Sequence, residues 1–202
     1  MHISEGVLSA SVLAGGGALT VIGTIIGLKR VSYDRIMSVA ILSSAFFVAS
    51  LVHLPVGPGS VHLLLNGLMG LILGWACFPA LLAALFLQAV FFQFGGIIVL
   101  GVNTFNMAAP ALLCSCFLRP WLFAPGFKGA AAAYVGGFFS VLLSSLCVAF
   151  CLALTDEGFI KTAGILVATH FPIMIIEGFV TMFIVSFLTR VQPDIFQMAK
   201  PR

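Results

Sequence analysis

Charged side chains are the scarcest feature of this sequence of 202 residues. Asp, Glu, Lys and Arg make up 7% of the chain and hydrophobic residues 61%, whereas an ordinary soluble domain is about 25% charged and about 45 to 50% apolar. The stretch from residue 36 to residue 118 contains no charged residue. This composition excludes a water-soluble domain, and it predicts a chain embedded in a lipid bilayer.

Three kinds of sequence signal are also absent. No Gly-Lys dipeptide occurs, so there is no phosphate-binding loop for ATP and we expect the chain not to be its own motor. The formal charge of +3 is spread over loops, without the basic stripe that would indicate a nucleic-acid partner. No basic segment and no small-residue cleavage site mark a signal peptide, so we expect Met1 to be kept.

Long apolar runs separated by Gly, Pro or charged residues predict about seven transmembrane helices, because one crossing needs about 20 residues. We expect an all-α integral membrane protein in which residues 1–202 form a single transmembrane domain that binds the substrate. The predicted spans are 7–28, 36–52, 62–77, 80–94, 103–118, 129–154 and 163–188.

The basic residues predict the orientation of this bundle, because the cytoplasmic loops of membrane proteins carry the excess of Lys and Arg. With seven crossings and the N-terminus outside, Lys161 is the only one of the nine basic residues that falls on the outer side. We therefore expect the N-terminus outside and the C-terminus in the cytoplasm.

This orientation gathers most of the nitrogen donors of the chain on the outer side. A peptide that begins with any residue followed by His can chelate a divalent metal through its amine, the deprotonated amide of residue two and the imidazole. Here these groups belong to Met1 and His2, and His62 at the start of the third predicted span would supply a fourth nitrogen. A plane of four nitrogens suits Ni(II) or Cu(II), and Co(II) fits it less well.

Other polar residues could orient such ligands through hydrogen bonds, because a metal-bound imidazole needs a partner on its other ring nitrogen. Each of them also has a structural explanation, for example Ser60 as a cap of the helix predicted to hold His62. The sequence leaves both explanations open. The candidates are Ser60, Asn66, Asn103, Asn106 and His170.

Glu177 lies in the last predicted span, on the same helix face as His170. An ionisable residue inside a membrane marks a functional site by default, and proton coupling is one interpretation. Anchoring of the helix by backbone or hydroxyl partners is the other interpretation. Cys147 and Cys151, four residues apart, leave a similar choice between a soft-metal site and core packing.

An intramembrane hydrolase is the main alternative from a different class. It would need an activated Ser, a His general base and an oxyanion hole at one depth in the membrane. Gly59-Ser60 with His170 comes nearest, but no Gly-x-Ser-x-Gly motif surrounds Ser60. We therefore expect no catalytic residue and no enzymatic activity.

The opening Met1-His2-Ile3-x-Glu5-Gly6-x-Leu8 resembles that of the CbiM/NikM proteins. These are the substrate-capture (S) subunits of energy-coupling-factor nickel and cobalt transporters. Further motifs of that family follow in the same order, so the resemblance covers essentially the whole chain. They lie at residues 60–63, 66–67, 87–89, 94–96, 101–108, 170–172 and 176–178.

The resemblance implies that the Met1 amine, the backbone nitrogen and imidazole of His2, and the His62 imidazole are the metal ligands. It also implies the six-helix fold of vitamin-capturing S subunits with an added N-terminal helix. The residues after His62 are more similar to those of nickel members, so we expect high-affinity capture and uptake of Ni²⁺, with Co²⁺ next and no organic cofactor. A vitamin-type S subunit is the alternative within this class.

The same resemblance implies partners. A transmembrane coupling (T) subunit and cytoplasmic ATPase subunits would drive uptake across the plasma membrane, with the metal site facing the external side. The sequence leaves open whether a small accessory membrane protein is also required.

Overall fold

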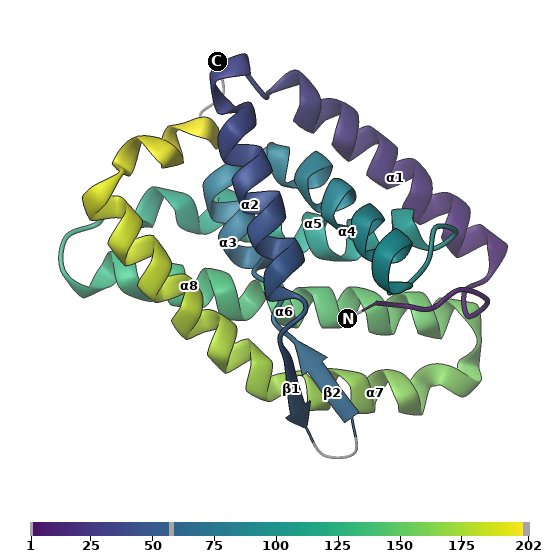
Figure 1. The fold of residues 1–202 in the computed structure, drawn as a ribbon. Coiled ribbons are helices and arrows are strands. Elements are labelled where there is room, and N and C mark those ends of the chain that lie inside the picture. The colour runs from purple at the N-terminus through teal and green to yellow at the C-terminus, as the bar shows by residue number, and fades with distance from the viewer. Residues whose placement is uncertain (1, 57–58, 200–202) are drawn as a thin grey trace.

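The computed structural model describes residues 2–56 and 59–199, with the backbone alone for residues 53–56, 59–61 and 197–199. Within these residues the chain forms eight α-helices and one antiparallel hairpin (Figure 1). The helices are α1 (Ala10–Lys29), α2 (Ile36–Ala49), α3 (Asn66–Leu73), α4 (Cys77–Phe92), α5 (Leu100–Leu118), α6 (Phe127–Thr155), α7 (Ile160–Thr169) and α8 (Phe171–Val191). The strands are β1 (His53–Val56) and β2 (Gly59–His62), and short 3-10 turns lie at η1 (Tyr33–Arg35), η2 (Gly74–Ala76), η3 (Arg119–Trp121), η4 (Glu157–Phe159) and η5 (Pro193–Ala199).

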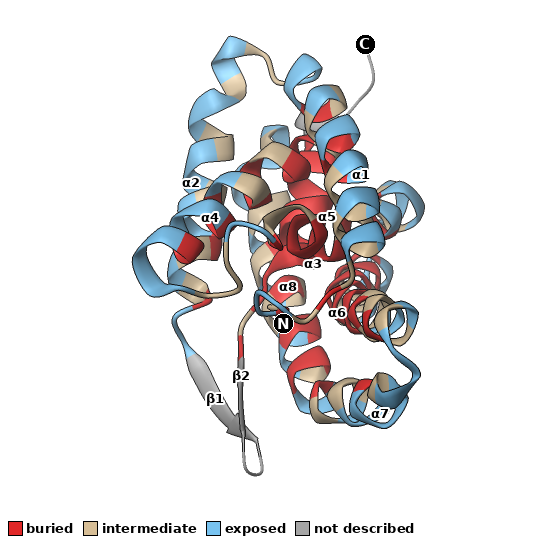
Figure 2. Cartoon of the chain, turned by 90° about the vertical axis from the view of Figure 1, so that its right-hand side faces the viewer, coloured by how far each residue is buried: buried red, intermediate tan, exposed pale blue. Residues whose placement is uncertain are grey.

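Helix α3 lies at the centre of the bundle, and all eight of its residues are buried. Helices α4, α5, α6 and α8 pack around it. Helix α1 lies outside this core against α4 and α5, and α2 packs mainly against α4. Figure 2 shows the result, with buried residues concentrated on α3, α5, α6 and α8 and the two outer helices largely exposed.

The outer surface of the bundle is apolar. Large hydrophobic side chains are exposed on every long helix, among them Ile25, Ile41, Phe91, Phe117, Phe150 and Phe183. Such a surface is stable in lipid and would aggregate in water. Five helical stretches of the described chain are long and apolar enough to cross a membrane: Ala10–Lys29, Asn66–Phe92, Leu100–Trp121, Phe127–Thr155 and Phe171–Val191.

Most of the predicted spans agree with observed helices, and the helical fold class is confirmed, with the short hairpin as an addition. Spans 7–28, 36–52, 80–94, 103–118 and 129–154 correspond to α1, α2, α4, α5 and α6. Helix α2 has only 14 residues, fewer than a crossing normally needs. The seven separate crossings, and the orientation inferred from them, therefore remain predictions.

The predicted span 62–77 is wrong at its start. His62 ends strand β2, and α3 begins only at Asn66. Leu65 between them has a left-handed backbone with a φ of 48°, which a helix does not accommodate. With eight residues, α3 is too short to cross a bilayer alone and continues through η2 into α4.

The predicted span 163–188 is two helices. Helix α7 ends at Thr169, and α8 begins at Phe171 with Pro172 in its first turn. Proline lacks the N–H that would continue the helix, and it disfavours helical backbone at the residue before it. His170 therefore lies at the junction, and Glu177 lies inside α8.

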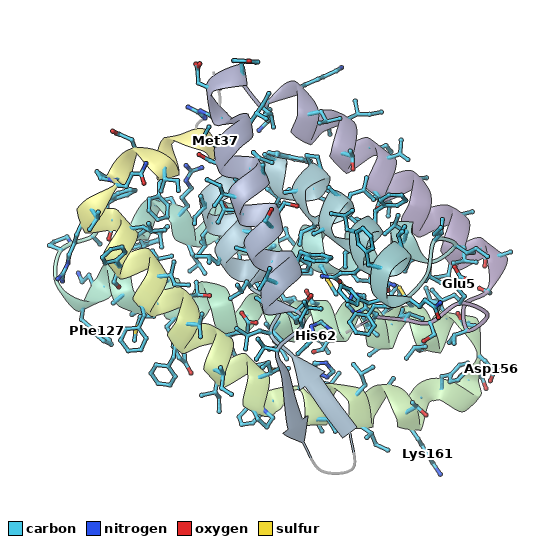
Figure 3. The ribbon with its side chains drawn as sticks, in the orientation of Figure 1. Glu5, Met37, His62, Phe127, Asp156 and Lys161 are labelled. Atoms are coloured by element: carbon cyan, nitrogen blue, oxygen red, sulfur yellow. The ribbon has the colours of Figure 1, made fainter. Side chains whose placement is uncertain are left out.

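The hairpin and the end of helix α1 lie at opposite sides of the bundle. The hairpin lies at the bottom of Figure 1, and the end of α1 lies at the top beside the start of α2. At that upper side the Arg30 guanidinium lies 5.3 Å from the centre of the Trp75 ring. Lys161 lies on the lower side (Figure 3), as the predicted orientation has it on the opposite side from Arg30.

Gly137 provides a test of the packing between α6 and α8. A Cβ at this position would lie 2.5 Å from the Glu177 carbonyl oxygen and 2.6 Å from Thr181 Oγ1. We expect Gly137→Ala to lower the free energy of unfolding by about 1–3 kcal/mol, because neither neighbour can move without separating the helices. Thermal unfolding in detergent measures this, with Gly15→Ala as the control because its Cβ would meet nothing within 4 Å. Equal midpoints for the two variants would contradict the packing.

Candidate metal-binding site

The N-terminal segment is held by one side chain of helix α5. The Oδ1 of Asn103 accepts a hydrogen bond from the Ile3 N–H at 3.0 Å, and its Nδ2 donates to the Ile3 carbonyl at 3.0 Å. Both residues are buried, so water does not compete for these groups. The side-chain amide pairs with both the N–H and the C=O of Ile3, as a neighbouring β-strand would. It therefore fixes the backbone directly after His2.

A second contact holds the segment two residues later. The Glu5 N–H donates to the Gly95 carbonyl at 3.2 Å, and the Glu5 carboxylate accepts from the Ile98 N–H at 2.9 Å. Because Ile98 lies just before α5, the carboxylate also lies near the positive end of that helix. The loop that receives Glu5 contains Gly96, which has a φ of 127° and at which a Cβ would collide with the Glu5 side chain.

These contacts bring His2 next to His62. The two ring centres lie 5.0 Å apart and the ring planes are inclined by 31°. His62 is buried at the end of β2, and Figure 3 shows it at the base of the hairpin. Phe94 lies beside them, with its ring centre 6.0 Å from that of His2.

The proton of the neutral His62 ring can be assigned from its neighbour. Its Nδ1 lies 3.1 Å from the Leu63 carbonyl oxygen, and a carbonyl can only accept. Nδ1 therefore donates, which makes Nε2 the basic nitrogen of a neutral His62. Among the described residues no group of three or more His, Cys, Asp or Glu side chains could hold a metal, so this pair of imidazoles would need other kinds of donor.

Glu177 fixes the segment that follows His62. Its carboxylate is fully buried and accepts hydrogen bonds from the backbone N–H groups of Leu64 and Leu65, with Leu65 at 2.9 and 3.0 Å from the two oxygens. These bonds stabilise the left-handed backbone of Leu65, a conformation that needs support from its surroundings. Glu177 therefore anchors α8 to the chain beside His62.

Gln88 is a residue that the sequence analysis did not include in the site. It lies in α4, is fully buried, and its Oε1 is 2.9 Å from His2 Nε2. Two signals were available: the family motif at residues 87–89, and an amide in a helix whose other residues are all apolar. Buried polar groups at such a depth need a partner, and here the partner comes from the N-terminus.

The geometry can now be compared with known proteins. The family described as the cobalt uptake substrate-specific transmembrane region, CbiM, matches residues 2–195. The chain belongs to the CbiM family. The resemblance inferred from the sequence motifs is thereby confirmed.

Relatives of this CbiM-family chain are metal transport proteins by name. It is 39% identical to a putative metal transport protein of Haemophilus influenzae over 198 residues, which cover 96% of each chain. It is 25% identical to a putative fused nickel transport protein of Archaeoglobus fulgidus, over 98% of this chain and 68% of that one.

A solved structure has the same fold. The crystal structure of a truncated transition metal transporter matches with a TM-score of 0.78 and 27% identity, over 96% of this chain and 99% of that one. Family and fold together make this chain a membrane component of cobalt or nickel uptake rather than an enzyme.

Three of the candidate residues in this CbiM-family chain form the following hydrogen bonds with groups other than His2 and His62. The Asn66 amide donates to the Met107 carbonyl and to Ser144 Oγ, which joins α3 to α5 and α6. The Asn106 amide pairs with Cys151 Sγ between α5 and α6, and His170 Nδ1 donates to the Leu166 carbonyl at 2.7 Å. These hydrogen bonds link helices or end one, and Asn66 and Asn106 lie within helices, as the predicted spans 62–77 and 103–118 have them.

Two further predicted residues cannot be placed. Met1, whose amine is a predicted ligand, lies outside the described residues, and so does the side chain of Ser60. The predicted role of Ser60 as a cap of the helix that holds His62 is wrong, because both residues belong to β2. The Met1 amine remains a predicted ligand.

Gly96 tests whether the loop before α5 holds the N-terminal segment. We expect Gly96→Ala to displace the Glu5 side chain and to raise amide hydrogen exchange of residues 3–8, measured by mass spectrometry. Gly126→Ala is the matched control, because Gly126 also has a positive φ, of 69°, but a Cβ there would meet nothing within 4 Å. Unchanged exchange in the Gly96 variant would show that the segment is held without this loop.

Proposed function

We propose that this chain captures Ni²⁺, with Co²⁺ as the next best ion, as the substrate-binding subunit of an ATP-driven energy-coupling-factor transporter. The proposal rests on the imidazoles of His2 and His62, whose ring centres lie 5.0 Å apart. The whole chain then acts as one substrate-binding domain in the plasma membrane. The metal is the transported substrate, and no organic cofactor takes part.

The separation of the two rings supports ligation of one ion. With a metal–nitrogen distance of about 2 Å, a ring centre lies about 3.1 Å from the metal, so rings at neighbouring corners of a square are about 4.4 Å apart and rings at opposite corners about 6.2 Å. The observed 5.0 Å is closer to the value for neighbouring corners.

Neighbouring corners are also what an N-terminal chelate requires. The Met1 amine, the His2 amide nitrogen and the His2 imidazole would occupy three successive corners, and His62 would fill the fourth, beside the imidazole of His2. Four nitrogens in one plane favour Ni(II) over Co(II). The hydrogen bonds of Asn103 to Ile3 support this arrangement, because they hold the chain directly after the chelate.

The position of the basic residues supports an external metal site. Helix α1 has 20 residues, which corresponds to about 30 Å, the thickness of the apolar part of a bilayer. The N-terminal segment and Lys29 at the other end of α1 therefore lie at opposite faces of the membrane. Since basic residues mark the cytoplasmic face, the metal would enter from outside.

Partner subunits would supply the energy for uptake, because the sequence has no Gly-Lys dipeptide and hence no phosphate-binding loop of its own. We propose a transmembrane coupling subunit and cytoplasmic ATPase subunits. The fused nickel transport protein of Archaeoglobus fulgidus, of which this chain covers 68%, supports a further membrane partner, and a small accessory membrane protein is the candidate.

Blocking the N-terminus tests the proposal. Protein that begins at Met1 and is offered equal nickel and cobalt is expected to bind about one nickel per chain, measured by mass spectrometry of the bound metal. Residues added before Met1, or acetylation of its amine, remove one ligand without touching the bundle, and nickel binding is lost. Residues added after the C-terminus are the matched control and leave it unchanged.

Each other outcome of this experiment contradicts part of the proposal. Native affinity in the N-terminally extended protein would exclude the chelate. Equal amounts of bound cobalt and nickel would exclude the preference for nickel. No bound metal in any form of the protein would instead favour a vitamin-capturing subunit.

Acid is expected to release the metal. The amine and the imidazoles bind a metal only when they are deprotonated. Protons therefore compete increasingly as the pH falls, and nickel affinity drops by more than about tenfold per pH unit because several ligands take up protons together. A competition titration between about pH 8 and pH 5 measures the slope. Constant affinity over this range would exclude amine and imidazole ligands.

A further inference from the structure

A chain of hydrogen bonds runs from His2 through α4 to the end of α2. His2 Nε2 lies 2.9 Å from Gln88 Oε1. On the other side of this amide, Gln88 Nε2 donates to Ser50 Oγ at 2.6 Å, and Ser50 Oγ donates to the Phe47 carbonyl at 2.7 Å. Gln88 and Ser50 are both fully buried.

The Phe47 carbonyl is the last acceptor, and it fixes the direction of every hydrogen bond in this series. The Phe47 carbonyl can only accept, so the Ser50 hydroxyl uses its one hydrogen there. The hydroxyl oxygen then accepts from the Gln88 NH₂ group, which turns the amide oxygen toward His2. An amide oxygen also accepts only, and His2 Nε2 must therefore carry a hydrogen.

The direction of these hydrogen bonds determines which ring nitrogen of His2 can bind a metal. A neutral imidazole with its hydrogen on Nε2 has its lone pair on Nδ1. Nδ1 is also the only ring nitrogen that closes a six-membered chelate with the backbone nitrogen of the same residue. The nitrogen with the lone pair is thus the one that the N-terminal chelate uses.

The same network links the two histidines through the backbone. Ser50 caps the end of α2, and the hairpin that follows it carries His62 at its end. The hairpin returns to this point, because the Leu63 N–H donates to the Val52 carbonyl at 3.4 Å. Ser50 therefore contacts Gln88, which supports the His2 ring, and it begins the segment that positions the His62 ring.

We propose that Gln88 and Ser50 are positioning residues that hold His2 in the tautomer with a hydrogen on Nε2 and so prepare Nδ1 for the metal. This inference rests on the proposed function. Neither residue touches the ion, and both act through the ring of His2. Partners of this kind behind a metal-bound histidine typically change metal affinity by about 10–100-fold.

Two independent readouts test the proposal. The tautomer of His2 is read in metal-free protein at neutral to mildly basic pH by NMR of ¹⁵N-labelled histidine, and nickel affinity is read by competition with a chelator. In the unmodified protein we expect the Nε2–H tautomer. In Gln88→Leu we expect a mixture of tautomers and about 10–100-fold weaker nickel binding.

Conservative variants separate positioning from packing. A carboxyl oxygen in Gln88→Glu still accepts from Nε2, so this variant keeps the Nε2–H tautomer and binds nickel more tightly than Gln88→Leu. Ser50→Ala keeps the Gln88 side chain but frees its orientation, and we expect an effect in the same direction on both readouts. Ser145→Ala is the matched control, because Ser145 is equally buried and its Oγ also donates to the carbonyl three residues earlier at 2.7 Å.

The outcomes decide between this inference and the proposed function. A hydrogen on Nδ1 in the unmodified protein, or native tautomer and affinity in both Gln88→Leu and Ser50→Ala, would overturn the inference. Failure of the unmodified protein to bind nickel would overturn the proposed function and the use of the tautomer for metal binding. It would leave the tautomer itself standing, because that is measured without metal. If Gln88→Leu does not fold, Ser50→Ala against Ser145→Ala decides.

Discussion

The two hydrogen bonds between the Asn103 side chain and the Ile3 backbone determine where the candidate site forms. Residues 2–8 lie in no helix or strand, yet Ile3 among them is buried in an apolar bundle, where an unpaired peptide group is strongly disfavoured. Asn103 supplies one donor and one acceptor, each at 3.0 Å. This pairing fixes the backbone directly after His2 and so sets the register of the N-terminus.

Buried polar side chains support each irregular segment around the site in the same way. Asn103 holds the N-terminal segment, Glu177 holds the backbone after His62, and Gln88 holds the ring of His2. Burying these groups is unfavourable unless their hydrogen bonds are satisfied. Irregular backbone within a membrane protein is tolerated only where other protein groups satisfy it, which explains why these three side chains lie beside the site.

The regular part of the fold could be predicted from sequence, and the irregular part could not. Lipid requires long uncharged helices, so hydropathy located five of them within a few residues. Residues 63–65 are all leucine and look helical, but the partner that bends them, Glu177, lies 112 residues from Leu65 along the chain. Gln88 was missed for the same reason, because 86 residues separate it from His2. The coordination chemistry of the N-terminus singled out the two histidines, and the fold places their rings side by side.

X-ray absorption at the nickel edge of the loaded protein is the most direct test of a four-nitrogen plane built on the N-terminus. The account predicts four nitrogen ligands at about 2 Å in a square-planar arrangement, with the scattering pattern of two imidazoles. In the His62→Ala protein that pattern should decrease to one imidazole. Six ligands, a sulfur ligand or an unchanged pattern in the variant would contradict it.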